Sequence, residues 1–245
     1  MEFYSNFIGM DTANQTTLFS GGDHEMSYTK NVLTQPDHWY YRDKTIEYQF
    51  NKLGHRSRNI EDIDLTNYIL FTGCSHTEGV GLELHKSYPY VTSKLLHSDY
   101  YNLGLGATGL DVMMYNLIGW FNTIKSLPRA VVIQWPDHSR FVTIHSELNI
   151  MPRGAWSTDS NIISGIISDD TTGSSFARAI LTKRLIEIVI PCPIHYVTLK
   201  SQIIPNNLKS TIVFPGLDVA RDLSHLGIES NKKLAELLVD AIKKH

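Results

Sequence analysis

Short apolar runs alternate with amphipathic stretches along most of this chain. Two of the runs, residues 68–72 and 130–135, are apolar almost throughout, which is typical of strands buried on both faces of a parallel sheet. Shorter apolar runs predict three further strands, at residues 100–103, 194–199 and 211–214. The chain therefore carries enough buried strands for a central sheet.

Apolar residues between these runs recur with helical spacing. They predict helices at residues 87–97, 110–124, 174–189 and 228–244. Strands that alternate with helices favour a parallel sheet that is covered by helices on both faces. The pattern thus predicts an α/β protein with a three-layer α/β/α sandwich.

The segments outside this pattern set the expected domain organisation. Residues 1–44 are polar and irregular, and we expect an N-terminal arm or cap without chemistry of its own. Residues 45–50 alternate apolar and polar positions and predict a half-buried strand that opens the main domain, 45–245. Within that domain, residues 143–173 are rich in Ser, Asp, Thr and Gly and predict an insertion that could cover a cleft as a lid.

Composition narrows the class of partner. The chain has 245 residues, 42% hydrophobic and 19% charged, as is ordinary for a globular protein. A formal charge of −3 gives no electrostatic reason to expect nucleic acid or an anionic membrane. Two cysteines are too few for a disulfide framework, and neither a signal peptide nor a membrane-spanning run is visible. We expect a protein that is cytoplasmic or otherwise soluble and that binds neither nucleic acid nor membrane.

A serine follows the strand predicted at 68–72, in the turn Gly73-Cys74-Ser75. The carboxyl ends of such strands face the ligand crevice of an open α/β sheet, and a tight turn offers backbone N–H groups there. Ser75 is therefore a candidate nucleophile, provided that a base lies near it. Towards the end of the chain, Asp222 and His225 are three residues apart, so the carboxylate can orient the imidazole as a general base.

Three blocks stand in order along the chain: Gly73-Cys74-Ser75-x-Thr77-x-Gly79, then Asn102-Leu103-Gly104-Leu105-Gly106, then Asp222-x-x-His225. They resemble the first, glycine and last blocks of the SGNH (GDSL-type) hydrolases, and the resemblance covers roughly residues 45–245. It implies a flavodoxin-like sheet and a serine esterase with Ser75, His225 and Asp222 as its catalytic triad. It also implies that no metal or organic cofactor is needed. The implied substrates are small-molecule or glycan esters, among them O-acetylated sugars, short acyl esters, lipids and thioesters.

The developing oxyanion of such a reaction needs hydrogen-bond donors. The Ser75 N–H is one candidate and the Gly104 N–H a second, because a residue without a Cβ lets its N–H approach a substrate closely. The family takes a third donor from an Asn in a Gly-x-Asn-Asp block, but residues 134–140 of this chain read QWPDHSR, without Asn. His138 falls closest to the missing position, and Arg140 is the fallback. Further residues are expected to line the substrate pocket: His76, Glu78, Asn102, Trp135 and Arg140.

Other interpretations of these residues stay open. Ser75, Asp222 and His225 could simply cap helices. His76 and Glu78, with Cys192 and His195, partly match the signature of zinc deaminases, although the separation of the two pairs is too large for it. An SGNH-type scaffold without the oxyanion Asn could also be catalytically weak or inactive and serve as a carbohydrate-binding or assembly module.

Overall fold

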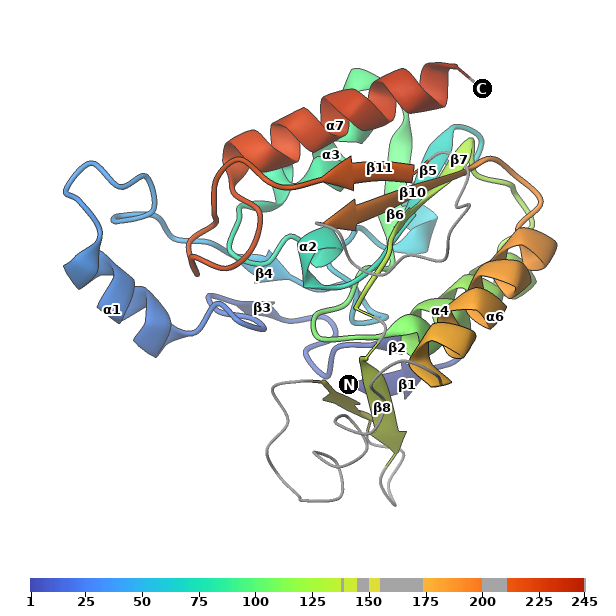
Figure 1. Cartoon of the computed structure of the whole chain (residues 1–245), viewed down its shortest axis with the longest axis horizontal. Helices are drawn as coiled ribbons and strands as arrows, with labels where there is room; N and C mark the ends of the chain where they lie inside the picture. Colours follow the sequence, from blue (N-terminus) through green and yellow to red (C-terminus); the bar gives the residue numbers. More distant parts are fainter. Residues whose placement is uncertain (138, 145–149, 155–173, 200–210, 245) are drawn as a thin grey trace.

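The structure is a computed structural model, and it describes residues 1–137, 139–144, 150–154, 174–199 and 211–244. Figure 1 shows a twisted central sheet with helices on both faces and the N-terminal segment below it. This sheet between two layers of helices is the expected three-layer α/β arrangement. Among the described residues, no helix is long and apolar enough to cross a membrane.

Five parallel strands form the central sheet: β5 (Tyr68–Thr72), β6 (Asp99–Asn102), β7 (Ala130–Gln134), β10 (Ile194–Leu199) and β11 (Thr211–Phe214). Their spatial order is β11-β10-β7-β5-β6. If the five strands are numbered one to five along the chain and read from the β6 edge, this order is 2-1-3-4-5, which is the flavodoxin-like order. The fold predicted from the apolar runs and from the resemblance is confirmed.

The helices cover both faces of the sheet because strand side chains alternate. Tyr68 and Leu70 of β5 point into the core beneath α4 (Leu110–Thr123) and α6 (Ser174–Val189). Ile69 and Phe71 point into the opposite core. That second core lies beneath α3 (Tyr88–Leu95) and α7 (Ile228–Lys243). These bounds lie within two residues of the predicted helices.

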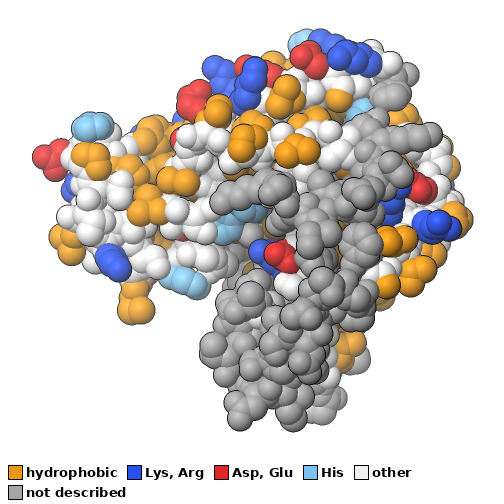
Figure 2. Space-filling model, in the orientation of Figure 1, with side chains coloured by type: hydrophobic (Ala, Val, Ile, Leu, Met, Phe, Trp, Pro, Cys, Tyr) orange, Lys and Arg blue, Asp and Glu red, His pale blue; other side chains and the backbone are white. Residues whose placement is uncertain are grey.

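Helix α7 illustrates the pattern that made the helices predictable. Leu234 and Leu238 of α7 are fully buried in the second core. Figure 2 shows acidic and basic side chains mixed along the edge of the molecule over α7. The helix therefore presents an apolar stripe to the sheet and a charged face outward.

The N-terminal arm is more regular than its polar sequence indicates. It forms a hairpin of β1 (Glu2–Tyr4) and β2 (Phe7–Gly9), a short strand β3 (Thr16–Thr17) and a helix α1 (Glu25–Thr34). The strand expected at 45–50 is reduced to β4 (Tyr48–Gln49), and it pairs with β3 instead of opening the domain. The strand is shorter than expected because its partner β3 offers only Thr16 and Thr17 for pairing. The expected division at residue 44 stays a prediction.

The segment expected to be a lid begins with regular structure. β8 (Phe141–Ile144) and β9 (Ile150–Arg153) pair as an antiparallel hairpin. Most of the predicted insertion, residues 145–149 and 155–173, lies outside the described residues. Three short helices complete the described chain: η1 (Ile60–Asp62), α2 (Ser75–Glu78) and η2 (Leu84–Lys86).

Candidate active site

The turn after β5 places Ser75 at the first position of α2. β5 lies between β6 and β7, where the strand order reverses, and such a switch point opens a crevice at the carboxyl ends of the strands. Gly73 makes the turn at φ 155°, and a Cβ there would lie 2.3 Å from Thr77 Oγ1 and 2.8 Å from Gln134 Cβ. Only glycine fits this elbow, because any side chain would collide with α2 and β7.

Ser75, His225 and Asp222 form one hydrogen-bonded chain. Ser75 Oγ lies 2.7 Å from His225 Nε2, and His225 Nδ1 is hydrogen-bonded to Asp222 Oδ2. The second carboxylate oxygen, Oδ1, accepts the N–H groups of Ser224 at 3.2 Å and of His225 itself at 3.1 Å. A carboxylate can only accept, so Nδ1 carries the ring proton and Nε2 is left to accept from Ser75.

Charge at Asp222 supports the same tautomer. Burial raises the pKa of its carboxyl, but the hydrogen bond from His225, the positive charge that His225 can carry and the two backbone N–H groups outweigh burial. The pKa of Asp222 therefore lies below its ordinary 3.8. At neutral pH the carboxylate is ionised and can stabilise a protonated His225.

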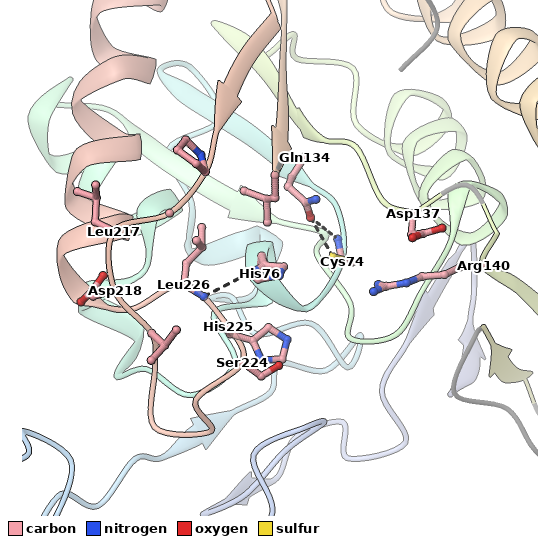
Figure 3. A pocket seen from close by; sticks show the side chains of 14 residues that line it. Cys74, His76, Gln134, Asp137, Arg140, Leu217, Asp218, Ser224, His225 and Leu226 are labelled. Atoms are coloured by element: carbon pink, nitrogen blue, oxygen red, sulfur yellow. Dashed lines mark hydrogen bonds between the residues drawn. The ribbon is translucent and has the colours of Figure 1, made fainter. Parts of the chain in front are cut away.

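Two adjoining cavities open beside His225, and one of them is also lined by Ser75. The smaller one, of about 250 Å³, we call the catalytic cavity. It is lined by Ser75 and His225 together with Gly21, Gly22, His76, Gly106, Ala107, Arg140 and Ser224. The larger one, of about 450 Å³, we call the outer cavity, and it shares His76, Arg140, Ser224 and His225 with the first. Figure 3 shows the outer cavity, with Arg140 pointing toward Cys74 and His76 beside His225.

His76, a predicted pocket residue, lies beside His225. Its ring centroid is 4.7 Å from that of His225, and its Nδ1 accepts the Leu226 N–H at 3.4 Å. Burial, with help from the charges of His225 and Arg140, lowers the pKa of His76 to about 3. His76 is therefore neutral at physiological pH, and Nε2 carries its proton.

Two other predicted pocket residues, Glu78 and Trp135, lie in the interior instead. Glu78 has no exposed surface, and its Oε2 accepts the Gly106 N–H at 2.5 Å; burial raises the pKa of its carboxyl. Trp135 is 1% exposed and packs edge-on against Tyr196, in the core beneath α4 and α6. Glu78 therefore holds the glycine block by its hydrogen bond to Gly106, and Trp135 packs in the core beneath α4 and α6.

The remaining predicted contacts of the glycine block are also internal. Asn102 is fully buried, and its amide donates to Thr77 O at 2.8 Å. Its Oδ1 accepts the Gly104 N–H at 2.9 Å. Gly104 was expected to serve the oxyanion, but its N–H is already used inside the protein. His138, the predicted third donor, lies outside the described residues.

Ala107 is a functional candidate that sequence reasoning missed. It adopts φ 61°, in the left-handed region that non-glycine residues rarely enter, and it lines the catalytic cavity with Ser75 and His225. Within the described part of the chain, neither the Ala107 N–H nor the Ser75 N–H donates to a protein acceptor. These two amides are thus free to meet a ligand in the cavity.

The zinc interpretation does not match the fold. His76 and Glu78 follow the carboxyl end of β5, whereas Cys192 precedes β10 and His195 lies at its amino end. His195 lines a separate cavity together with Arg129 and Lys243. In the described ranges, no three His, Cys, Asp or Glu side chains are grouped so as to hold a metal ion.

Comparisons with known proteins find similar structures but no similar sequences. No protein-family model and no curated protein matches the sequence. A carbohydrate esterase of family 2 from Corynascus thermopiles (Myceliophthora fergusii) aligns with 73% of this chain at 15% identity and a TM-score of 0.44. An acetyl xylan esterase from Butyrivibrio proteoclasticus aligns with 73% at 16% identity and a TM-score of 0.46.

The aligned regions span 66% and 64% of those two chains, just under two thirds of their length. A G-D-S-L family lipolytic protein from Desulfitobacterium hafniense is aligned over 99% of its own length and 71% of this chain, at 13% identity and a TM-score of 0.37. The solved structures to which this chain is similar thus include carbohydrate esterases and a G-D-S-L family lipolytic protein.

Proposed function

We propose that this protein is a serine ester hydrolase that works through an acyl-enzyme. The observation that carries the proposal is the continuous hydrogen-bonded chain from Ser75 Oγ through His225 to Asp222. A serine hydroxyl is a poor nucleophile until a base removes its proton, and His225 Nε2 accepts from it at 2.7 Å. This geometry supports Ser75 as the nucleophile, His225 as the base and Asp222 as the orienting carboxylate.

The reaction runs in two halves. Ser75 Oγ attacks the acyl carbon while its proton passes to His225 Nε2, and the ester carbonyl becomes an oxyanion. The protonated His225, stabilised by Asp222, then gives this proton to the leaving alkoxide, and the alcohol departs. Water, deprotonated by His225, attacks the Ser75 ester in the same way, and the collapse returns the proton to Ser75 and releases the carboxylic acid.

The oxyanion is assigned to the Ser75 and Ala107 N–H groups. Both residues line the catalytic cavity, and neither amide donates to a described protein group. One such donor is typically worth about 2.7–4 kcal/mol in the transition state. His138 stays a prediction as third donor. Arg140, which lines both cavities, is the other candidate.

Size and lining guide the choice of substrate. The catalytic cavity holds about 250 Å³, which suits a short acyl group such as acetyl. The outer cavity adds about 450 Å³ for the alcohol part of the ester. It offers apolar Leu199 and Pro215 together with polar Gln134 and Asp137, so an acetylated carbohydrate is the substrate class to test first.

The test is hydrolysis of p-nitrophenyl acetate together with labelling by a fluorophosphonate probe. Wild-type protein should release p-nitrophenol and take up the probe at Ser75. Ser75→Ala should abolish both while its far-UV circular dichroism is unchanged. A Ser75→Ala variant that hydrolyses as fast as wild type would remove Ser75 as nucleophile.

The absence of an Asn between residues 134 and 140 favours one alternative, a scaffold that binds carbohydrate without cleaving it. In that case, the wild-type chain would take up no probe and release no p-nitrophenol. Isothermal titration with an acetylated xylo-oligosaccharide would still show binding. These measurements on the wild-type protein thus distinguish an ester hydrolase from a carbohydrate-binding scaffold.

A further inference from the structure

A buried ion pair ties the N-terminal arm to the segment that carries the triad acid and base. Arg221 Nη2 lies 2.6 Å from Asp23 Oδ2, and Arg221 Nε donates to Asp23 Oδ1 at 3.0 Å. The two side chains are 2% and 0% exposed, although 198 residues separate them in sequence. Arg221 immediately precedes Asp222, so the arm is anchored one residue from the triad.

Further contacts hold the guanidinium and the backbone carbonyl of Arg221 in place. Its guanidinium donates to Leu18 O at 2.8 Å and lies 4.9 Å from the ring centres of both Phe19 and Tyr28. Its backbone carbonyl accepts from Asn31 Nδ2 at 3.0 Å. All of these neighbours belong to the arm, as the ion-pair partner does, whereas the Arg221 N–H donates to Gly81 O, outside the arm, at 3.2 Å. The arm thus holds the side chain and the carbonyl of this residue.

The same part of the arm touches the triad directly. Ser20 to Asp23 form a tight turn, closed by the Asp23 N–H on Ser20 O at 3.1 Å. Gly22 stands against the triad, since a Cβ there would lie 3.4 Å from both Asp222 Oδ2 and His225 Cε1. Gly21 and Gly22 also line the catalytic cavity. The turn is therefore one wall of that cavity.

The segment that bears the proposed acid and base, 218–227, is held both by its own hydrogen bonds and by the arm. It is closed on itself by the Ala220 N–H on His225 O at 2.9 Å, and Leu223 between them adopts φ 59°, in the left-handed region. Arg221 joins this segment to the arm through its ion pair with Asp23. A displacement of Arg221 would be passed to Asp222 through a single peptide unit.

We propose that the turn at residues 20–23 is part of the catalytic centre and that Asp23 is a positioning residue, acting through Arg221 on the Asp222–His225 pair. The inference rests on the proposed hydrolase function. A buried ion pair is weak evidence of stability, because desolvation of both charges offsets most of their attraction. Its value here is geometric: it sets where Asp222 stands and how far the arm lies from His225.

The test compares Asp23→Asn with Asp37→Asn in the full chain. Both variants convert an aspartate of the arm into an amide, but Asp37 is exposed and lies 3.6 Å from Arg42 in a surface pair. Competent sites are counted by the end point of fluorophosphonate labelling at Ser75. The kcat for p-nitrophenyl acetate is then expressed per labelled site, which corrects for any unfolded fraction.

We expect Asp23→Asn to lower kcat per site by about 10- to 100-fold, since a misplacement of about 1 Å can cost 10²-fold. Asp37→Asn should leave it unchanged. Arg221→Gln and the double variant complete a mutant cycle. Because Asp23 acts through Arg221, the double variant should lose no more kcat per site than the worse single variant.

A purely structural ion pair would reduce the number of labelled sites but not kcat per site. That result, or single losses that multiply in the double variant, would overturn the proposal. If Asp23→Asn yields no folded protein, Arg221→Lys keeps the charge and is measured in the same way. A lowered kcat per site in Arg221→Lys supports the positioning role, and an unchanged one refutes it.

Failure of the proposed function would look different. Wild-type protein would then neither hydrolyse the ester nor take up the probe. The effect of Asp23 on the Asp222–His225 pair is in that case observed by NMR, through the signal of the proton between His225 Nδ1 and Asp222. Loss or displacement of this signal in Asp23→Asn supports the positioning role, and a signal identical to that of wild type overturns it.

Discussion

Replacing Asp222 by Asn tests the triad through the orientation of a single amide. Asp222 Oδ1 accepts two backbone N–H groups, at 3.2 Å from Ser224 and 3.1 Å from His225, while Oδ2 accepts from His225 Nδ1. An asparagine at this position must keep its oxygen toward the two backbone donors. Turning the amide round would leave both donors unsatisfied, at about 1–3 kcal/mol each.

The amide nitrogen of the substituted side chain would therefore face His225 Nδ1. A donor at this place forces Nδ1 to accept, so the ring proton moves to Nε2, opposite Ser75 Oγ. The base is then blocked, because its only lone pair is on Nδ1, where it accepts from the amide, and Nε2 can no longer take the proton of Ser75. Recovering the productive tautomer means flipping the amide, which costs about 2–6 kcal/mol for the two donors together.

We expect Asp222→Asn to lower kcat for p-nitrophenyl acetate by about 10⁴-fold, the loss typical of a wrong tautomer and equal to about 5.5 kcal/mol. The fold should persist, since the amide keeps both backbone hydrogen bonds. Initial rates and far-UV circular dichroism measure the two effects, with Asp37→Asn as the exposed control. Long-range ¹H–¹⁵N NMR should show the His225 proton on Nε2. Activity within about tenfold of wild type, or a proton that remains on Nδ1, would refute this reasoning.

Two further predictions concern stability. Gly73→Ala should lower the free energy of unfolding by at least about 2 kcal/mol in urea, since its Cβ would lie 2.3 Å from Thr77 Oγ1; an unchanged midpoint would contradict the tight elbow. Burial lowers the pKa of His55 to about 4 and of His76 to about 3, from 6.5. Unfolding therefore takes up protons, and stability should fall as pH drops from about 6 to 4, by about 1.4 kcal/mol per pH unit for each ring. His76→Gln should reduce this slope, and an equal slope would refute the assignment.

The central sheet could be predicted because its signal is local. The runs at 68–72 and 130–135 are apolar almost throughout, and a strand buried on both faces needs no other information. Ser75 could be proposed for the same reason, since a polar residue directly after such a strand must lie at the carboxyl end of the sheet. Its meeting with His225 followed from the family resemblance of the blocks, and the two side chains do meet.

Side-chain direction could not be predicted in the same way. Glu78 lies on the same side of α2 as Ser75, since residues three apart share a helix face, yet its carboxylate is fully buried and accepts the Gly106 N–H instead of lining the cavity. His76, one residue from Ser75, faces the cavity. Asn102 has the polarity of a binding residue, yet its amide is hydrogen-bonded to the backbone of Thr77 and Gly104. Proximity along the chain says little about which way a side chain points.

The contact between the arm and the candidate site was missed because it is not local in sequence. Nothing near Asp23 in the sequence indicates an arginine 198 residues away. The positive φ of Ala107 has no compositional signal either, because alanine rarely adopts it. Both features depend on the assembled tertiary structure, which a pattern of apolar positions does not encode.

The distance along the chain between Ser75 and His225, 150 residues, also bears on the order of events when the protein folds. Contacts between remote segments close large loops and so tend to form late. A ribosome releases the segment that carries the base only after all five strands of the central sheet have been made. Under the proposed mechanism, chains that end before residue 225 would hold the nucleophile without its base, so hydrolysis would begin only after the segment that carries His225 had been made.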